Sequence, residues 1–128
     1  IMVLTSPKIK IEDTHLSEEN YIRCNKLWKT SQLVDFCEEK KYQPFKAPLA
    51  CFDLSFMNFP VSDLNSFILQ CKRALDADLK YPIIIDDLGI VANGYHRIVK
   101  AILEGKTEID CIRMEEMPDN YEEYKCEE

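Results

Sequence analysis

The sequence predicts a small α+β domain in which a mixed sheet is packed by about three helices. Two observations indicate this fold class. Residues 81–114 contain two short apolar runs separated by a turn, then a helical pattern and a final alternating run, and residues 62–78 carry a clear helical period. The length of 128 residues fits one domain with its own core and is too short for two ordinary domains.

The N-terminal part is predicted to contain two strands and one helix. Residues 8–12 alternate polar and apolar side chains, which fits an early strand or an extended arm, and residues 17–19 have the composition of a helix start. A strand is expected near residues 26–29, with Trp28 in the core rather than in a ligand platform. Thr30 or Ser31 then caps a helix. The side chains expected on its apolar face are Leu33, Val34, Phe36 and Cys37.

The middle of the chain is predicted to contain an edge strand and the clearest helix. Pro44 and Pro48 bracket a short strand that continues to Ala50, because proline is tolerated at sheet edges. Ser62 and Asp63 start a helix that ends near residues 76–78. The side chains expected on its buried face are Leu64, Phe67, Ile68, Cys71 and Leu75. The loop phenylalanines expected to plug the core are Phe52, Phe56 and Phe59.

Residues 81–114 have the densest local signals. The Pro-Ile-Ile-Ile run at 82–85 predicts a buried strand, and a turn ending in Gly89 leads to a second strand at 90–92, so the pair predicts a hairpin. From Tyr95 the apolar period becomes helical, with Gly105 as the C-cap. The side chains expected on one face of this helix are Ile98, Ala101 and Ile102. Residues 109–113 alternate again, as a last strand does.

An acidic segment follows this region. Residues 115–128 are rich in glutamate, and such a segment is expected to be mobile or to form a frayed helix. The predicted domain therefore spans residues 1–114, with 61–113 as its best-supported part.

Composition and charge limit the classes of partner. The net charge is −7 and the basic residues are scattered, which makes duplex DNA an unfavourable partner. No apolar run approaches the ~20 residues of a membrane span. The start of the chain lacks the basic region and long apolar run of a signal peptide. We therefore expect a cytoplasmic protein without a membrane partner.

The cysteines predict thiols rather than a metal site. The six cysteines, at positions 24, 37, 51, 71, 111 and 126, include no Cys-x-x-Cys pair, and two histidines accompany them. Zinc sites need close pairs of ligands, so no structural metal is expected. Cys37, Cys71 and Cys111 stand among apolar neighbours and are expected in the core.

The loop formed by Asn93, Gly94, Tyr95, His96 and Arg97 carries the strongest signal for chemistry. The Asn-Gly break places the backbone N–H groups of residues 94–97 at a helix N-terminus, where the helix dipole favours an anion. An imidazole and a guanidinium in this first turn oppose the dipole unless a negative ligand arrives. The alternative is structural: Arg97 pairs with a nearby carboxylate and His96 occupies a hydrogen-bonding niche.

The order of these features resembles the ParB/sulfiredoxin superfamily, and the similarity is strongest over residues 61–113. There the corresponding region often has a Pro-Ile-x-Val strand, an Asp-Gly turn, an Asp-Gly-x-His-Arg loop and an alanine-rich helix. The resemblance implies a ParB/sulfiredoxin-like fold with a phosphate-binding loop at residues 93–97. Members include partition proteins that bind and hydrolyse CTP, sulfiredoxin, which uses ATP to repair peroxiredoxin, a free-serine kinase and proteins labelled nucleases.

The sequence departs from this family pattern at two positions of the loop. Tyr95 stands where sulfiredoxin has its reactive cysteine, which excludes sulfiredoxin chemistry. Asn93 stands where an acid is usual, and an amide cannot act as a general base. Partition proteins also contain a helix-turn-helix domain, which the acidic segment after Arg113 does not provide.

Three functional hypotheses follow. The first is a stand-alone domain that binds a nucleotide or phosphate: backbone amides near Gly94 cradle the phosphate, Arg97 clamps it, His96 donates a hydrogen bond and Tyr95 packs on a base or ribose. An enzyme of this kind would be a phosphotransferase or nucleotide hydrolase using a nucleoside triphosphate with Mg²⁺. Its catalytic candidates are His96, Asp76 and Asp78, followed by Asp86 and Asp53.

The second hypothesis is a non-enzymatic interaction or inhibitor protein that uses the same fold and an acidic surface. The third is a DNA-associated partition-like protein or nuclease, which the charge balance disfavours.

Overall fold

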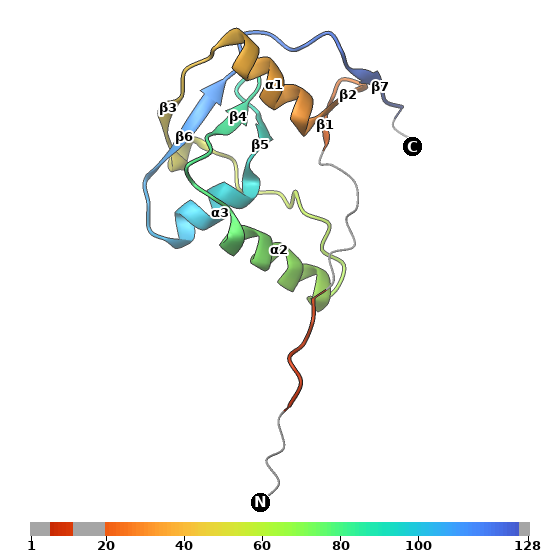
Figure 1. Ribbon diagram of the computed structural model, residues 1–128, viewed down its shortest axis with the longest axis vertical. Helices are drawn as coiled ribbons and strands as arrows, with labels where there is room; N and C mark the ends of the chain where they lie inside the picture. Colours follow the sequence, from red (N-terminus) through yellow and green to blue (C-terminus); the bar gives the residue numbers. More distant parts are fainter. Residues whose placement is uncertain (1–5, 12–19, 126–128) are drawn as a thin grey trace, which may run out of the picture.

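The computed structural model describes residues 6–11 and 20–125 and confirms a single α+β domain. The described helices are α1 (Thr30–Lys40), α2 (Leu64–Asp76), α3 (Tyr95–Leu103) and the short 3-10 helix η1 (Leu49–Cys51). One sheet has the order β1 (Asn20–Arg23), β2 (Lys26–Lys29), β7 (Glu122–Glu123). The other has the order β3 (Phe45–Pro48), β6 (Glu108–Arg113), β4 (Ile83–Ile85), β5 (Val91–Asn93), as Figure 1 shows. This second sheet is mixed, because β4 runs parallel to β6 while the other two pairs are antiparallel.

The four-stranded sheet is covered on both faces. On one face, Ile83 and Ile85 pack with Ile98 of α3. On the opposite face, Ile84 packs with Trp28 of β2 and Leu33 of α1. Successive side chains of a strand point to opposite faces, so a strand covered on both sides needs an unbroken apolar run. This requirement explains the three consecutive isoleucines of β4, and it places α3 and α1 on opposite sides of the sheet.

Local signals determine the two ends of α3, as the sequence predicts. Gly94 is the N-cap with a φ of 122°, and Gly105 follows the last turn with a φ of 77°. The N–H of Lys106 donates to the Ala101 carbonyl at 3.0 Å, which satisfies a carbonyl that the helix leaves open. The hairpin of β4 and β5 before α3 is also confirmed.

The β1–β2 hairpin supplies the main aromatic anchor of the other face. Its two-residue turn, Cys24 and Asn25, has positive φ values of 51° and 62°, as a tight hairpin turn requires. Trp28 is 1% exposed, and its indole N–H donates to the Pro118 carbonyl at 2.9 Å. The predicted core position of Trp28 is therefore confirmed.

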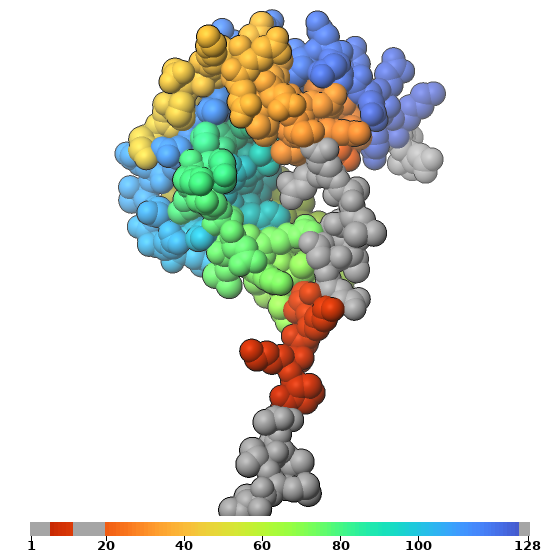
Figure 2. All heavy atoms as spheres, in the orientation of Figure 1, coloured from red at the N-terminus to blue at the C-terminus, as the bar shows by residue number. Residues whose placement is uncertain are grey.

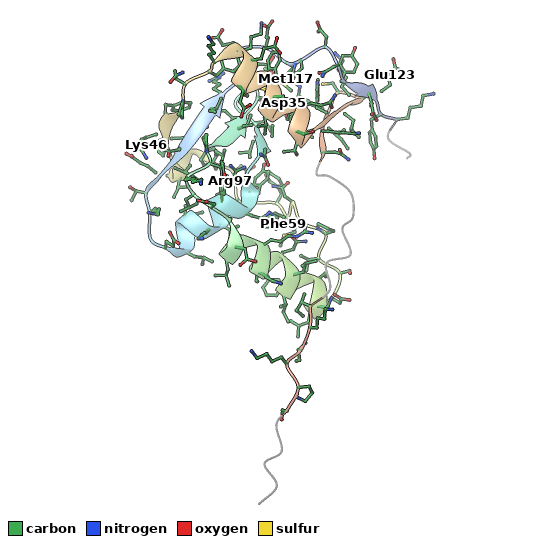
Figure 3. The ribbon with its side chains drawn as sticks, in the orientation of Figure 1. Asp35, Lys46, Phe59, Arg97, Met117 and Glu123 are labelled. Atoms are coloured by element: carbon green, nitrogen blue, oxygen red, sulfur yellow. The ribbon has the colours of Figure 1, made fainter. Side chains whose placement is uncertain are left out.

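The segment after Met114 differs from the separate tail predicted over residues 115–128. Met117 and Pro118 lie against the Trp28 cluster, and β7 pairs with β2. Figure 2 shows this segment in blue against α1 in orange, and Figure 3 labels Met117 beside α1. Glutamates dominate the composition, but Met117 and Pro118 contact the Trp28 cluster, and the backbone of Glu122 and Glu123 pairs with the edge of β2. Residues 126–128 lie outside the described part.

The buried face of α2 also differs from the prediction. The buried side chains of α2 are Leu69, Gln70 and Ala74, whereas Leu64 and Leu75 are 71% and 69% exposed. Cys71, predicted as a core thiol, is exposed, while Cys37 and Cys111 are buried as predicted. Apolar residues cover more than one side of this helix, so their spacing identifies the helix without identifying the strip that α3 covers.

This difference gives the first testable expectation. Leu69→Ala should lower the free energy of unfolding by about 2–5 kcal/mol because it removes a buried side chain. Leu64→Ala should change it by less than about 0.5 kcal/mol, because Leu64 is mostly exposed. Urea unfolding of both variants measures the two values. Equal losses in the two variants would mean that α2 packs through the face predicted from the sequence.

Smaller differences concern the N-terminal half. Residues 6–11 form no strand, which matches the extended arm, and the predicted helix start at 17–19 lies outside the described residues. The edge strand ends at Pro48 instead of Ala50, because the chain turns into η1. Of the loop phenylalanines, Phe52 packs against the core while Phe56 stays half exposed. Within the described chain, every helix is too short or too polar to cross a membrane.

Candidate functional site

The start of α3 is built by a close approach of two backbones. A Cβ atom added at Gly94 would lie 2.4 Å from Cγ2 of Ile83, the first residue of the buried β4 strand. Gly94 also has a φ of 122°, a backbone conformation that residues with a Cβ atom rarely adopt. Glycine therefore lets the loop lie directly on β4. The first N–H groups of α3 have no acceptor within the helix, and they form the positive end of its dipole.

A cleft of about 590 Å³ opens at this helix start. Its walls are the first turn of α3, strands β5 and β1, the loop at residues 56–60, and Gln70 and Arg73 of α2. The lining combines amide side chains from Asn20, Asn58 and Asn93 with aromatic rings. None of the described residues that line the cleft is an aspartate or a glutamate. The cleft therefore offers hydrogen-bond donors and two basic side chains in a protein whose net charge is −7.

His96 is held in one orientation by two contacts. Its ring stacks on Phe59 with centroids 4.2 Å apart and planes at 19°. Its Nε2 lies 2.8 Å from Oε1 of Gln70. A carbonyl oxygen only accepts hydrogen bonds, so Nε2 carries the hydrogen in this contact. The ring plane and the protonated nitrogen of His96 are thus both determined by neighbours in the cleft wall.

Only one end of the Gln70 carboxamide has a hydrogen-bond partner among the described residues. The residue is 5% exposed, and its Oε1 accepts from His96, but its Nε2 has no hydrogen-bond partner among the described residues. A buried donor without an acceptor costs about 1–3 kcal/mol of stability. The wall of the cleft therefore holds a buried donor that no acceptor among the described residues uses.

Tyr95 and Asn93 also belong to this cleft, as predicted for the loop. The ring of Tyr95 lies edge-on to Phe56 with centroids 6.1 Å apart, so these two aromatic rings form one side of the cleft. Asn93 ends strand β5 beside them. The structure therefore brings residues 93–96 together, as the sequence predicts.

Arg97 lies elsewhere. Its Nη1 donates to the backbone carbonyls of Tyr81 and Pro82 at 3.0 and 2.7 Å, and the residue lines a separate cavity of about 400 Å³ beside α1. Figure 3 shows Arg97 nearer to the sheet and Phe59 beside α2. Neighbouring residues of a helix point about 100° apart, so His96 and Arg97 cannot face the same side. Arg97 thus contacts the chain that leads into β4 and does not line the cleft.

The four candidate carboxylates lie outside the cleft. Asp76 and Asp78 are exposed at the C-terminal end of α2, where Asp78 accepts from the N–H of Lys80 at 3.0 Å. Asp53 accepts from Ser55, and this hydrogen bond lowers the pKa of the Asp53 carboxyl. Asp86 is completely buried under the hairpin turn. Among the described residues, no group of three or more histidine, cysteine, aspartate or glutamate side chains is placed to hold a metal ion.

Asp86 instead supports two walls of the cleft. Its Oδ2 accepts from the hydroxyl of Tyr21 at 2.5 Å and from Arg23 at 2.8 Å, both on β1. Its Oδ1 accepts from the N–H groups of Leu88 and Ile90 at 2.9 and 2.8 Å. One carboxylate therefore joins β1 to the β4–β5 hairpin. A lysine links the other two elements, since Lys100 of α3 donates to two carbonyls at the end of α2.

Sequence reasoning missed the cleft residues outside the loop. Gln70, Arg73 and Phe59 come from segments 20 to 40 residues before the loop in the chain. Only the packing of α2 on α3 brings them together. One signal was present for Gln70, because at helical spacing it falls between the apolar residues Phe67 and Ala74.

A second cavity, of about 350 Å³ and mostly apolar, lies between α2 and α3. The side chains that line both cavities are Phe56, Asn58, Phe59, Gln70 and Tyr95, so they form a shared wall. Exposed apolar side chains surround this second cavity, among them Met57, Phe67 and Leu103.

The chain was compared with family models, with curated proteins and with solved structures. None of them matched. The similarity to the ParB/sulfiredoxin superfamily therefore rests on the loop residues and their order along the chain, and it remains a prediction.

Proposed function

We propose that this domain binds a phosphorylated small molecule, with a nucleotide as the leading candidate, in the cleft at the start of α3. The observation that carries the proposal is the composition of the cleft. Four groups converge there: the N-terminus of a nine-residue helix, His96, Arg73 and a buried amide nitrogen of Gln70 that has no partner among the described residues. None of the described lining residues is acidic. Helix N-termini with nearby cations favour phosphate groups.

Each group has a distinct part in this proposal. The N–H groups of the first turn of α3 cradle a phosphate, and Arg73 adds a positive charge from α2. The cleft volume is in the range of small-molecule sites and exceeds what one phosphate fills, so the ligand has a further moiety. The amides of Asn20 and Asn58 can both donate to and accept from hydroxyls or base edges. Arg97, expected from the sequence to clamp the phosphate, instead supports the loop from behind.

Binding, rather than hydrolysis, is the activity we propose. The resemblance to the ParB/sulfiredoxin superfamily implies a nucleoside triphosphate with Mg²⁺, and Asp76, Asp78, Asp86 and Asp53 were its candidate carboxylates. None of the four lines the cleft. A magnesium ion at this site would be held chiefly by the phosphates of the ligand and by water, as Mg²⁺ commonly is.

Thermal-shift screening tests the proposal. Purified protein is heated with ATP, CTP, GTP, ADP or inorganic phosphate, each with and without Mg²⁺. A ligand at 100 times its dissociation constant should add about 2.7 kcal/mol to the free energy of unfolding and raise Tm by several degrees. Arg73→Gln should remove most of this shift, because Arg73 lines the cleft.

The matched control is Lys72→Gln, which removes the same charge from the neighbouring exposed position of α2 outside the cleft. It should keep the full shift. Equal losses in both variants would mean that only the overall charge attracts the ligand. No shift with any of the five compounds would contradict the proposal.

A second candidate function, binding of a protein partner, is favoured by one observation. Phe67, Met57 and Leu103 stay exposed around the apolar cavity between α2 and α3, and such patches often mark interaction surfaces. A partner that binds this surface through an apolar helix face should be captured by the wild type and lost by Phe67→Asn. The same partner should still bind the Lys46→Gln variant, which changes an exposed lysine of β3. If both variants bound the partner, this surface would not be its binding site.

A further inference from the structure

The two ends of the Gln70 carboxamide differ in their hydrogen bonding. Its oxygen accepts from Nε2 of His96 at 2.8 Å, and its nitrogen has no partner among the described residues. With the hydrogen of His96 on Nε2, a half-turn of the amide would place two N–H donors against each other, so this tautomer of His96 and this orientation of Gln70 go together. In this tautomer the nitrogen of Gln70 is the end that has no partner among the described residues. Phe59 in turn holds the ring of His96 by stacking.

This arrangement is costly for a group that serves folding alone. Leucine or methionine would fill the same space without leaving a buried donor unpaired. The residues on either side of Gln70 in the buried strip are Leu69 and Ala74, which are apolar. A glutamine with an unused N–H between such neighbours is better explained by an acceptor that arrives from outside the chain.

We propose that Gln70 is the specificity-determining residue of the cleft: its Nε2 donates to a phosphate oxygen of the ligand, and His96 holds the carboxamide in the orientation that makes this possible. The inference rests on the proposed function and extends it from a helix terminus to a side chain of α2. Ionised phosphate oxygens accept hydrogen bonds, so a donor fixed in this way favours phosphate over groups that can only donate.

Nε2 of Gln70 is buried, so we expect a phosphate oxygen to reach it only when side chains of the shared wall move. Phe56, Asn58 and Phe59 of that wall belong to the loop between η1 and α2, and they are the part of the wall that comes from neither helix.

Two substitutions separate the donor from the rest of the side chain. Gln70→Glu keeps an oxygen for His96 but replaces the donor by an acceptor. Gln70→Met keeps the approximate volume and removes both groups. In titration calorimetry with inorganic phosphate, and with whichever of ATP, CTP and GTP the wild type binds, both variants should bind about 10- to 100-fold more weakly. The Tm of Gln70→Met without ligand should stay close to that of the wild type, because the removal of the unpaired Nε2 offsets the loss of the acceptor for His96.

Gln43→Glu is the control for the added charge, since Gln43 is exposed in the segment after α1, outside the cleft. It should bind as the wild type does. Wild-type affinity in Gln70→Glu and Gln70→Met would overturn the role of Gln70 while leaving the proposed function intact. A lower Tm in Gln70→Met, with unchanged binding, would make Gln70 a structural residue. Failure of the wild type to bind any of these probes would overturn both proposals.

Discussion

Gly94→Ala is expected to destabilise the domain by about 3–5 kcal/mol, the sum of a strained backbone and an overpacked core. The new methyl group would lie 2.4 and 2.7 Å from two side-chain carbons of Ile83, and 3.2 Å from its Cα. Ile83 is completely buried and has no free direction in which to move. Thermal unfolding should show Tm lower by about 10 °C or more.

Gly89→Ala is the matched control. Gly89 has a φ of 85°, but a Cβ at this position meets nothing within 4 Å. Gly89→Ala should therefore lower the free energy of unfolding only by the cost of the strained backbone, about 1–2 kcal/mol. If Gly94→Ala and Gly89→Ala lost the same stability, the close approach of the loop to β4 would be wrong. The geometry of the cleft, which depends on that approach, would be wrong with it.

Asp86→Ala is expected to lower the free energy of unfolding by about 3–5 kcal/mol, because it leaves buried partners without their acceptor. Tyr21, Arg23 and two backbone N–H groups all donate to this carboxylate. The control is Asp87→Ala, which removes a partly exposed carboxylate that also pairs with Arg23. That change should cost about 0–1 kcal/mol. Urea unfolding of both variants gives the comparison, and equal costs would contradict the buried network.

The same network predicts a pH dependence. Burial raises the pKa of the Asp86 carboxyl, but the hydrogen bonds from Tyr21, Ile90, Arg23 and Leu88 together outweigh it, so its pKa is below the ordinary value. A carboxyl with a lowered pKa in the folded state contributes its full stability above the unfolded value of about 3.9. That contribution is lost as the pH falls through the folded pKa.

Asp86→Asn removes this titration. The difference in Tm between the wild type and Asp86→Asn should therefore be constant near neutral pH and narrow as the pH falls below about 4. Thermal unfolding at a series of pH values measures it. A difference that stays constant down to the lowest pH would show that Asp86 has an ordinary pKa.

The parts of the fold that the sequence predicts correctly depend on neighbouring residues. The hairpin of β4 and β5, the break at Gly94 and the end of α3 near Gly105 each have their signal within a few residues. Turns and helix caps are determined by local backbone geometry, so local sequence is enough to find them. The run of isoleucines in β4 also indicates that this strand is buried on both faces.

The errors concern packing between distant segments. The apolar stripe of α2 was predicted to be buried, but Leu69 and Ala74 are the buried apolar side chains of this helix and Leu64 is exposed. The acidic segment appears separate by composition, yet Met117 packs against the Trp28 cluster and β7 pairs with the edge of β2. In both cases the neighbour that decides burial lies far away in the sequence, and periodicity gives no information about it.

The candidate site shows the same division. Residues 93–96 were found from their motif, whereas Arg97 was assigned to the same side because a motif does not show direction around a helix. The groups that complete the cleft, from β1, from the loop at 56–60 and from α2, carry no motif. Their arrangement depends on the Asp86 network and on Lys100, which hold those elements around the start of α3.

The most direct test of the phosphate-binding cleft is amide chemical-shift mapping by NMR during titration with ATP and, separately, with inorganic phosphate. If the ligand binds in this cleft, the largest chemical-shift changes should occur at the backbone N–H groups of residues 94–96 and at the side-chain amide of Gln70. These changes should saturate at a common ligand concentration. Changes confined to scattered surface lysines, or no changes at the start of α3, would contradict binding in this cleft.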